Sequence, residues 1–138
     1  MTNMEAAIVF PLLPGKRHAL AQFVSELNGE HCAAHDRSHS MVSRESWFMQ
    51  PTPQGDLVIV YLESPDPTEV FAELAVSRNA FEVWFRAQVL DLTGMDLAML
   101  PPFCVPTRIL HRVRENTNQT MPDSTSALER SQWQPPAD

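Results

Sequence analysis

One segment limits what this chain can fold into: residues 56–63, with the sequence DLVIVYLE. It is rich in β-branched residues and follows a loop of turn residues, so it predicts a β-strand. Alternate residues of a strand point to opposite faces. The apolar residues of the two faces are Leu57, Ile59 and Tyr61 on one, and Val58, Val60 and Leu62 on the other. A short chain can hardly cover both faces of its sheet, so we predict that a second copy covers one of them in a homodimer.

Strands and helices alternate along the rest of the chain. Further strands are predicted at residues 5–12, 43–50 and 107–113, and the middle one forms a hairpin with residues 56–63 across a proline-rich loop. Apolar residues recur at helical spacing in residues 16–27 and 80–92, and a polar helical stretch covers residues 30–39. Another helix is predicted to start at Asp66, where Asp66, Pro67 and Glu69 form an N-terminal capping pattern.

The resulting order of elements, β-α-β-β-α-β, is the ferredoxin-like arrangement of an α+β domain. We assign residues 1–113 to this one domain. Residues 114–138 are polar and poor in aromatic residues, and we expect them to form a disordered tail.

Composition excludes several classes of partner. The formal net charge is -7, from 10 Lys and Arg against 17 Asp and Glu, which disfavours binding to nucleic acid. No apolar run approaches the roughly 18 residues of a membrane span, so we expect no membrane partner. The first residues lack the basic region of a secretory signal, and the two cysteines share no CxxC spacing. We therefore expect a cytoplasmic protein.

Three strings together suggest a family. AIVFPLLPGK (residues 7–16), TPQGDLVIVYLES (residues 52–64) and an FxxWFR helix that ends at Gly94 resemble small bacterial proteins of the dimeric α+β barrel superfamily, over about residues 5–113. That superfamily includes cofactor-free monooxygenases of aromatic polyketide pathways, muconolactone-isomerase-like enzymes and haem proteins. The resemblance implies a dimer whose sheets meet face to face, with a pocket between sheet and helices in each protomer. No catalytic motif of the monooxygenases matches, so it implies no catalytic residue.

The most unusual feature of the sequence is a run of three histidines, His31, His35 and His39, spaced four residues apart. On a helix they share one face, and HxxxH spacing allows two imidazoles to bind one metal ion. Three interpretations stay open: a general base that lines a pocket, a metal or haem site, and a solvated polar face.

Other candidates lie on the predicted strands. Arg44 and Glu45 are adjacent and point to opposite faces, so they cannot both enter one pocket. We interpret them as charges of a strand-edge ion pair, with Arg44 as an alternative oxyanion ligand. Tyr61, the only tyrosine, needs a partner for its hydroxyl and could orient a substrate. A pocket for a flat organic ligand could be lined by Trp47, Phe48, Phe81, Trp84 and Phe103.

These observations favour a small-molecule enzyme without an organic cofactor. It would act on an apolar or aromatic metabolite by oxygenation, isomerisation or cyclisation, with His31, His35 or His39 as acid or base and Arg44 or Tyr61 at an oxyanion. The alternatives are a non-catalytic ligand-binding or regulatory module that uses the same pocket, and a His-ligated metal or haem protein.

Overall fold

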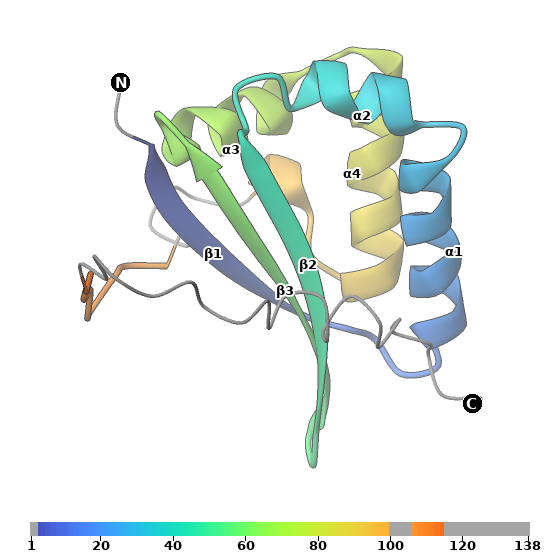
Figure 1. Ribbon diagram of the computed structural model, residues 1–138. Helices are drawn as coiled ribbons and strands as arrows, with labels where there is room; N and C mark the ends of the chain where they lie inside the picture. The colour runs from blue at the N-terminus through green and yellow to red at the C-terminus, as the bar shows by residue number, and fades with distance from the viewer. Residues whose placement is uncertain (1–2, 100–105, 115–138) are drawn as a thin grey trace.

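The computed structural model describes residues 3–99 and 106–114. Within these ranges the chain forms a mixed α+β structure (Figure 1). Its strands are β1 (Met4–Pro11), β2 (Arg44–Thr52) and β3 (Gly55–Ser64). Its helices are α1 (Arg17–Asn28), α2 (Cys32–Ser38), α3 (Pro67–Val76) and α4 (Ala80–Thr93), followed by the short 3₁₀ helix η1 (Leu97–Met99).

The three strands form one antiparallel sheet in the order β1-β3-β2. β1 runs along β3 from the pair Met4–Ser64 to the pair Pro11–Leu57, and β2 and β3 form the predicted hairpin, which closes at Thr52 and Gly55. Gly55 has a φ of 127°, a conformation that favours glycine, so the turn depends on this residue. The predictions of these three strands and of the hairpin are confirmed.

Three helix boundaries follow from local capping. The Asp66 carboxylate accepts a hydrogen bond from the backbone N–H of Glu69 at 3.2 Å, with Pro67 in the first turn of α3, as predicted. Asn79 caps α4 in the same way through the N–H of Phe81, and Gly94 ends α4 in the left-handed conformation, with a φ of 74°. α3 and α4 are thus placed by short sequence signals.

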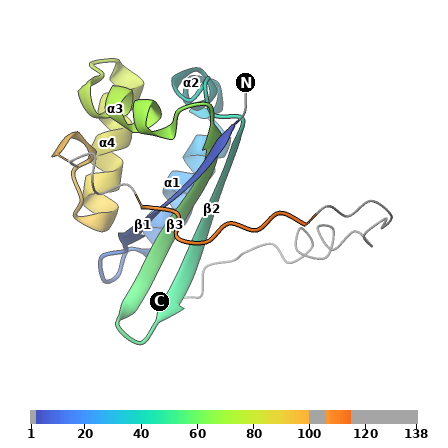
Figure 2. The same ribbon diagram turned by 90° about the vertical axis from the view of Figure 1, so that its left-hand side faces the viewer.

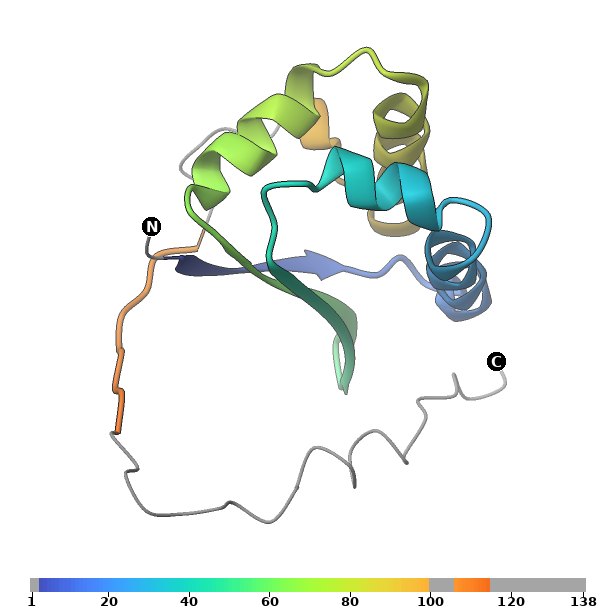
Figure 3. The same ribbon diagram turned by 45° about the horizontal axis from the view of Figure 1, so that its top comes forward.

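All four helices lie on one side of the sheet, which gives two layers (Figures 2 and 3). The core lies between the layers. It combines Val58, Val60 and Leu62 of β3 with aromatic and aliphatic residues of the helices, which include Phe23, Phe81, Phe85, Val89 and Leu92. No described helix covers the other face of the sheet, where Val9 and Phe48 are exposed.

The predicted strand at residues 107–113 is not formed. These residues have no regular secondary structure and are exposed, with Ile109 at 95% and Val113 at 75% exposure. An exposed ion pair at 3.0 Å links Arg108 of this segment to Glu5 of β1. An apolar alternation predicts which residues would share a face, but a strand also needs a hydrogen-bonding neighbour, and none is present here. The last element of the predicted ferredoxin-like order is therefore missing from the described residues.

The predicted tail lies outside the described residues from residue 115 onward. Among the helices that are described, none has the length and apolar character needed to cross a membrane.

Candidate functional site

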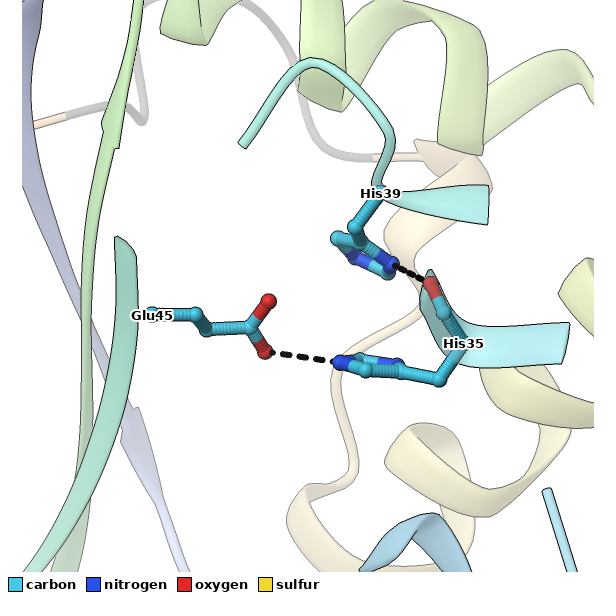
Figure 4. A group of neighbouring side chains, drawn as sticks. All are labelled: His35, His39 and Glu45. Carbon is cyan, nitrogen blue, oxygen red and sulfur yellow. Dashed lines mark hydrogen bonds and ion pairs between the residues drawn. The ribbon is translucent and has the colours of Figure 1, made fainter. Parts of the chain in front are cut away.

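Two histidines and one glutamate converge between helix and sheet (Figure 4). His35 lies within α2, His39 directly follows that helix, and Glu45 lies on β2. One side-chain ligand atom from each of the three lies within 4.8 Å of the corresponding atoms of the other two. All three side chains are partly buried. We refer to His35, His39 and Glu45 as the His-Glu cluster.

Simple periodicities bring the cluster together. His35 and His39 are one helical turn apart, so their rings lie side by side, with centroids 4.3 Å apart. On β2, alternation directs Glu45 and Trp47 toward the helices, and Arg44 and Phe48 toward the opposite face. Phe85 of α4 packs behind both imidazoles, with ring centroids 6.0 Å from His35 and 5.7 Å from His39.

The Glu45 carboxylate is held by two donors. Its Oε2 accepts a hydrogen bond from Trp47 Nε1 at 2.6 Å and lies 3.3 Å from His35 Nε2. His39 is oriented separately: its Nδ1 lies 3.3 Å from the carbonyl oxygen of His35. When Nδ1 of His39 carries the proton and donates a hydrogen bond to that carbonyl, Nε2 keeps a free lone pair.

Burial and charge set the ionisation of the cluster. Burial lowers the pKa of His39 below its ordinary value, and this effect exceeds the opposing attraction of Glu45. Burial alone would raise the pKa of Glu45, but the His35 hydrogen bond, the nearby His39 and the Trp47 hydrogen bond outweigh it, so the pKa of Glu45 is lowered. Near neutral pH the site thus contains an ionised carboxylate beside a neutral His39.

Nδ1 of His35 is buried and has no hydrogen-bond partner among the described residues. Buried polar atoms without a partner are rare in folded proteins and often mark functional sites. The Glu45 carboxylate lies at Nε2, so Nε2 of His35 carries the proton and donates to Glu45. Nε2 becomes a lone-pair ligand only when the proton moves to Nδ1.

The cluster lines a cavity of about 620 Å³ between α1, α2 and the start of β2. Apolar side chains of α1 and β2 and polar groups of the α2–β2 connection share its wall. Besides the cluster, the lining includes Val24, Leu27, Trp47, Asn28, Ser43 and Arg44. On their inner side, His39 and Glu45 also border the apolar interior between the sheet, α3 and α4. The cluster therefore lies where an open, mixed cavity meets the core.

The third predicted histidine, His31, does not join the cluster. It precedes α2, and its ring stacks on Trp84 of α4 with centroids 4.1 Å apart. Its Nε2 lies 3.7 Å from Glu30, an exposed carboxylate. The three histidines therefore do not share one helical face as predicted, because α2 begins only at Cys32 and leaves His31 outside the helix.

The two predicted oxyanion ligands are not placed together with the histidines. Tyr61 is on the opposite face of the sheet, where its hydroxyl donates to Glu63 at 3.0 Å. Partial burial and the neighbouring Glu63 and Glu5 raise the pKa of Tyr61 to about 12. Arg44 lines the cavity rim, but its guanidinium pairs with Glu63 at 3.4 Å and is 70% exposed. Arg44 thus forms the predicted ion pair at the strand edge, but with Glu63 across the ladder on β3, whereas Glu45 contacts His35.

The predicted aromatic pocket is also dispersed. Of its five residues, Trp47 alone is among the described residues that line the large cavity. Phe48 borders a separate apolar groove of about 210 Å³ beside β2, and Phe81 and Trp84 pack against each other in the helix layer. Phe103 lies outside the described residues.

Sequence reasoning missed Glu45 as a member of the site. One observation pointed to it: strand alternation places the Glu45 carboxylate on the same face as the large aromatic side chain of Trp47. What the sequence could not provide was the packing of α2 over that end of β2.

No family model, curated protein or solved structure matches this chain. The resemblance to the dimeric α+β barrel superfamily therefore stays a prediction.

Proposed function

We propose that this protein is a small-molecule enzyme that transfers protons at the His-Glu cluster, without an organic cofactor. One observation carries the proposal: two imidazoles and a carboxylate, all partly buried, converge on the wall of a cavity of about 620 Å³. A cavity of this size suits a small metabolite, and imidazoles are the most frequent proton-transfer groups in enzymes.

In this proposal His39 is the general base. Its lowered pKa keeps it neutral near pH 7, and its Nδ1 contact to the His35 carbonyl leaves Nε2 to accept a proton. Glu45 stabilises the imidazolium that forms, because the carboxylate is ionised and close. Trp47 and His35 hold Glu45 in place, so both are positioning residues.

The cavity lining favours a substrate with an apolar body and a polar end. Val24, Leu27 and Trp47 offer apolar contacts, and Asn28, Ser43 and the cluster offer polar ones. Proton abstraction next to a carbonyl, followed by reprotonation elsewhere, is an isomerisation. If the carbanion instead attacks a second carbonyl carbon of the same molecule, the C=O π bond breaks, the new alkoxide takes a proton, and the reaction is a cyclisation. Both reactions need only a proton acceptor, a proton donor and exclusion of water.

Proton transfer can be tested before the full reaction is known. A panel of small aromatic and aliphatic ketones is incubated with the full chain in D₂O, and deuterium incorporation next to the carbonyl is followed by NMR. We expect exchange with the wild type, loss of about a hundredfold or more in His39→Gln, and full retention in the control His18→Gln, an exposed histidine of α1. Equal exchange in His39→Gln and the wild type, or no exchange with any ketone of the panel, would refute the proposal.

We also propose the finer fold and assembly that the sequence predicts, a ferredoxin-like protomer in a homodimeric α+β barrel. In support, the uncovered face of the sheet is apolar at its centre, where Val9, Ile59 and Phe48 form one row across the three strands. Val9 is 46% and Phe48 56% exposed. A contiguous apolar patch of this kind marks an interaction surface. Light scattering on the full chain tests it, and a monomer at every concentration would exclude it.

A further inference from the structure

We propose that the His-Glu cluster is also a binding site for one first-row divalent transition-metal ion, such as Zn²⁺, held by His35, His39 and Glu45. The inference uses the same three side chains as the proposed function but does not depend on turnover. Two histidines and one carboxylate, with remaining positions open toward a cavity, form a ligand set typical of catalytic zinc and non-haem iron sites.

Distances within the cluster fit this ligand set. Zn–N and Zn–O bonds are about 2.0–2.2 Å long, so donors around a tetrahedral ion lie about 3.4 Å apart. The contact between His35 Nε2 and Glu45 Oε2 is already 3.3 Å. One ligand atom of each of the three residues lies within 4.8 Å of those of the other two. Small side-chain rotations therefore suffice to bring all three donors to one ion.

Groups around the cluster are arranged as a metal site requires. A histidine that binds a metal through one nitrogen usually donates its other N–H to a carbonyl or carboxylate. Nδ1 of His39 has such a partner in the His35 carbonyl, which leaves Nε2 for the ion. Trp47 Nε1 donates to the Glu45 carboxylate and fixes its orientation. His35 differs from His39, because its buried Nδ1 has no partner among the described residues, and binding of an ion at Nε2 would move the proton to Nδ1.

The donor types select the kind of ion. Mg²⁺ and Ca²⁺ prefer oxygen ligands only, whereas imidazole nitrogen suits Zn²⁺, Fe²⁺, Co²⁺ and Ni²⁺. Charge also favours a divalent cation, because Glu45 is a partly buried acidic side chain whose contacts are with His35 and Trp47. A second group, Glu26, Glu30 and His31, offers comparable ligand spacing, but its central residue is exposed and its ion would meet one imidazole only.

Metal and proton compete for the same lone pair. An ion bound to Nε2 of His39 removes the general base, so the metal-loaded form is expected to be inactive in the ketone exchange reaction. Metal binding would thereby regulate the proposed enzyme at its own reaction centre.

The test measures binding without any substrate. The full chain, prepared without a polyhistidine tag and treated with chelator, is titrated with Zn²⁺ by calorimetry and with Co²⁺ by visible absorption. We expect one ion per chain with a Kd below about 10 µM, and an affinity at least about tenfold weaker in His39→Gln and in Glu45→Gln. His31→Gln is the matched control, because it removes a neighbouring histidine that belongs only to the second group. It should bind as the wild type does.

A measurement on the wild type guards against variants that do not fold. The imidazole NMR signals of His35 and His39 should shift on addition of Zn²⁺, and those of His31 and His18 should not. Absence of binding below about 10 µM, or binding that is lost in His31→Gln and kept in Glu45→Gln, overturns the inference. Exchange of ketone protons without metal binding would refute only this inference, and metal binding by a chain that shows no exchange in its metal-free form would refute only the proposed function.

Discussion

The two faces of the sheet come from the same strands and are similar in sequence, but only one of them belongs to the core. On β3, Val58, Val60 and Leu62 are at most 7% exposed, because all the helices pack on their side. On the other face Phe48 is 56% exposed. The face that packs against the helices, called the inner face, also carries Glu45 and Trp47. The opposite or outer face carries Arg44 and Tyr61. Alternation along a strand thus divides residues between faces, but the helices decide which face becomes core and site.

The largest difference between the faces is expected from truncating one apolar residue on each. Leu62→Ala should lower the free energy of unfolding by about 3 kcal/mol, because Leu62 is only 2% exposed and its truncation leaves a cavity in the core. Ile59→Ala, on the outer face, should cost about 1 kcal/mol or less in the monomer. Urea unfolding at several protein concentrations separates the monomer from any dimer. Equal losses in the two variants would contradict the assignment of the faces.

A smaller effect is expected from a charge on the outer face. If a second copy covers this face, Phe48→Glu should weaken the dimer at least tenfold, or about 1.4 kcal/mol, and leave the circular dichroism spectrum unchanged. Val83→Glu on α4 is the matched control, because Val83 is similarly exposed, at 47%, but lies away from the sheet. Analytical ultracentrifugation gives both dissociation constants. The same dissociation constant for Phe48→Glu and for the wild type would exclude this face as the interface.

Much of the fold could be predicted because its signals are local. The turn at Gly55, the cap at Asp66 and the end of α4 at Gly94 each depend on residues close in sequence. Residues 107–113 show the limit of this reasoning. Their β-branched and apolar residues are typical of a strand, but a strand forms only beside a partner, and partners are distant in sequence.

The site was predictable only in part, for the same reason. His35 and His39 could be paired from their spacing, since one helical turn separates them. Glu45 could not be assigned to the same site, because its position beside the two histidines depends on how α2 packs over β2. Tyr61 could be assigned to the strand face opposite Leu62, but which of the two faces the helices cover is a matter of tertiary packing.

The inner face should also lose stability as the pH falls into the acidic range. The pKa of His39 is lowered in the folded chain, so the unfolded chain binds its proton first as the pH falls. The stabilising contribution is complete above the ordinary value of 6.5 and is lost as the pH falls toward the lowered value. The pKa of Glu45 is also lowered in the folded chain, so protonation of Glu45 reduces the free energy of unfolding further as the pH falls below 4.5. Unfolding with chelator present should therefore show a loss below pH 6.5 that His39→Gln reduces and the exposed-histidine control His18→Gln does not.

The smallest effect is expected at the polar end of the outer face, where Arg44 and Glu63 form an ion pair at 3.4 Å. Because the Arg44 side chain is 70% exposed, solvent screens the pair and it should contribute less than about 0.5 kcal/mol. Arg44→Ala should therefore leave the urea midpoint almost unchanged, and added salt should remove what difference remains. A loss above about 1 kcal/mol would mean that the pair is desolvated, which on this face requires a covering partner. If the loss in unfolding free energy of Arg44→Ala then grows with protein concentration, the covering partner is a second copy of the chain. It would lie at the end of the sheet next to the cavity.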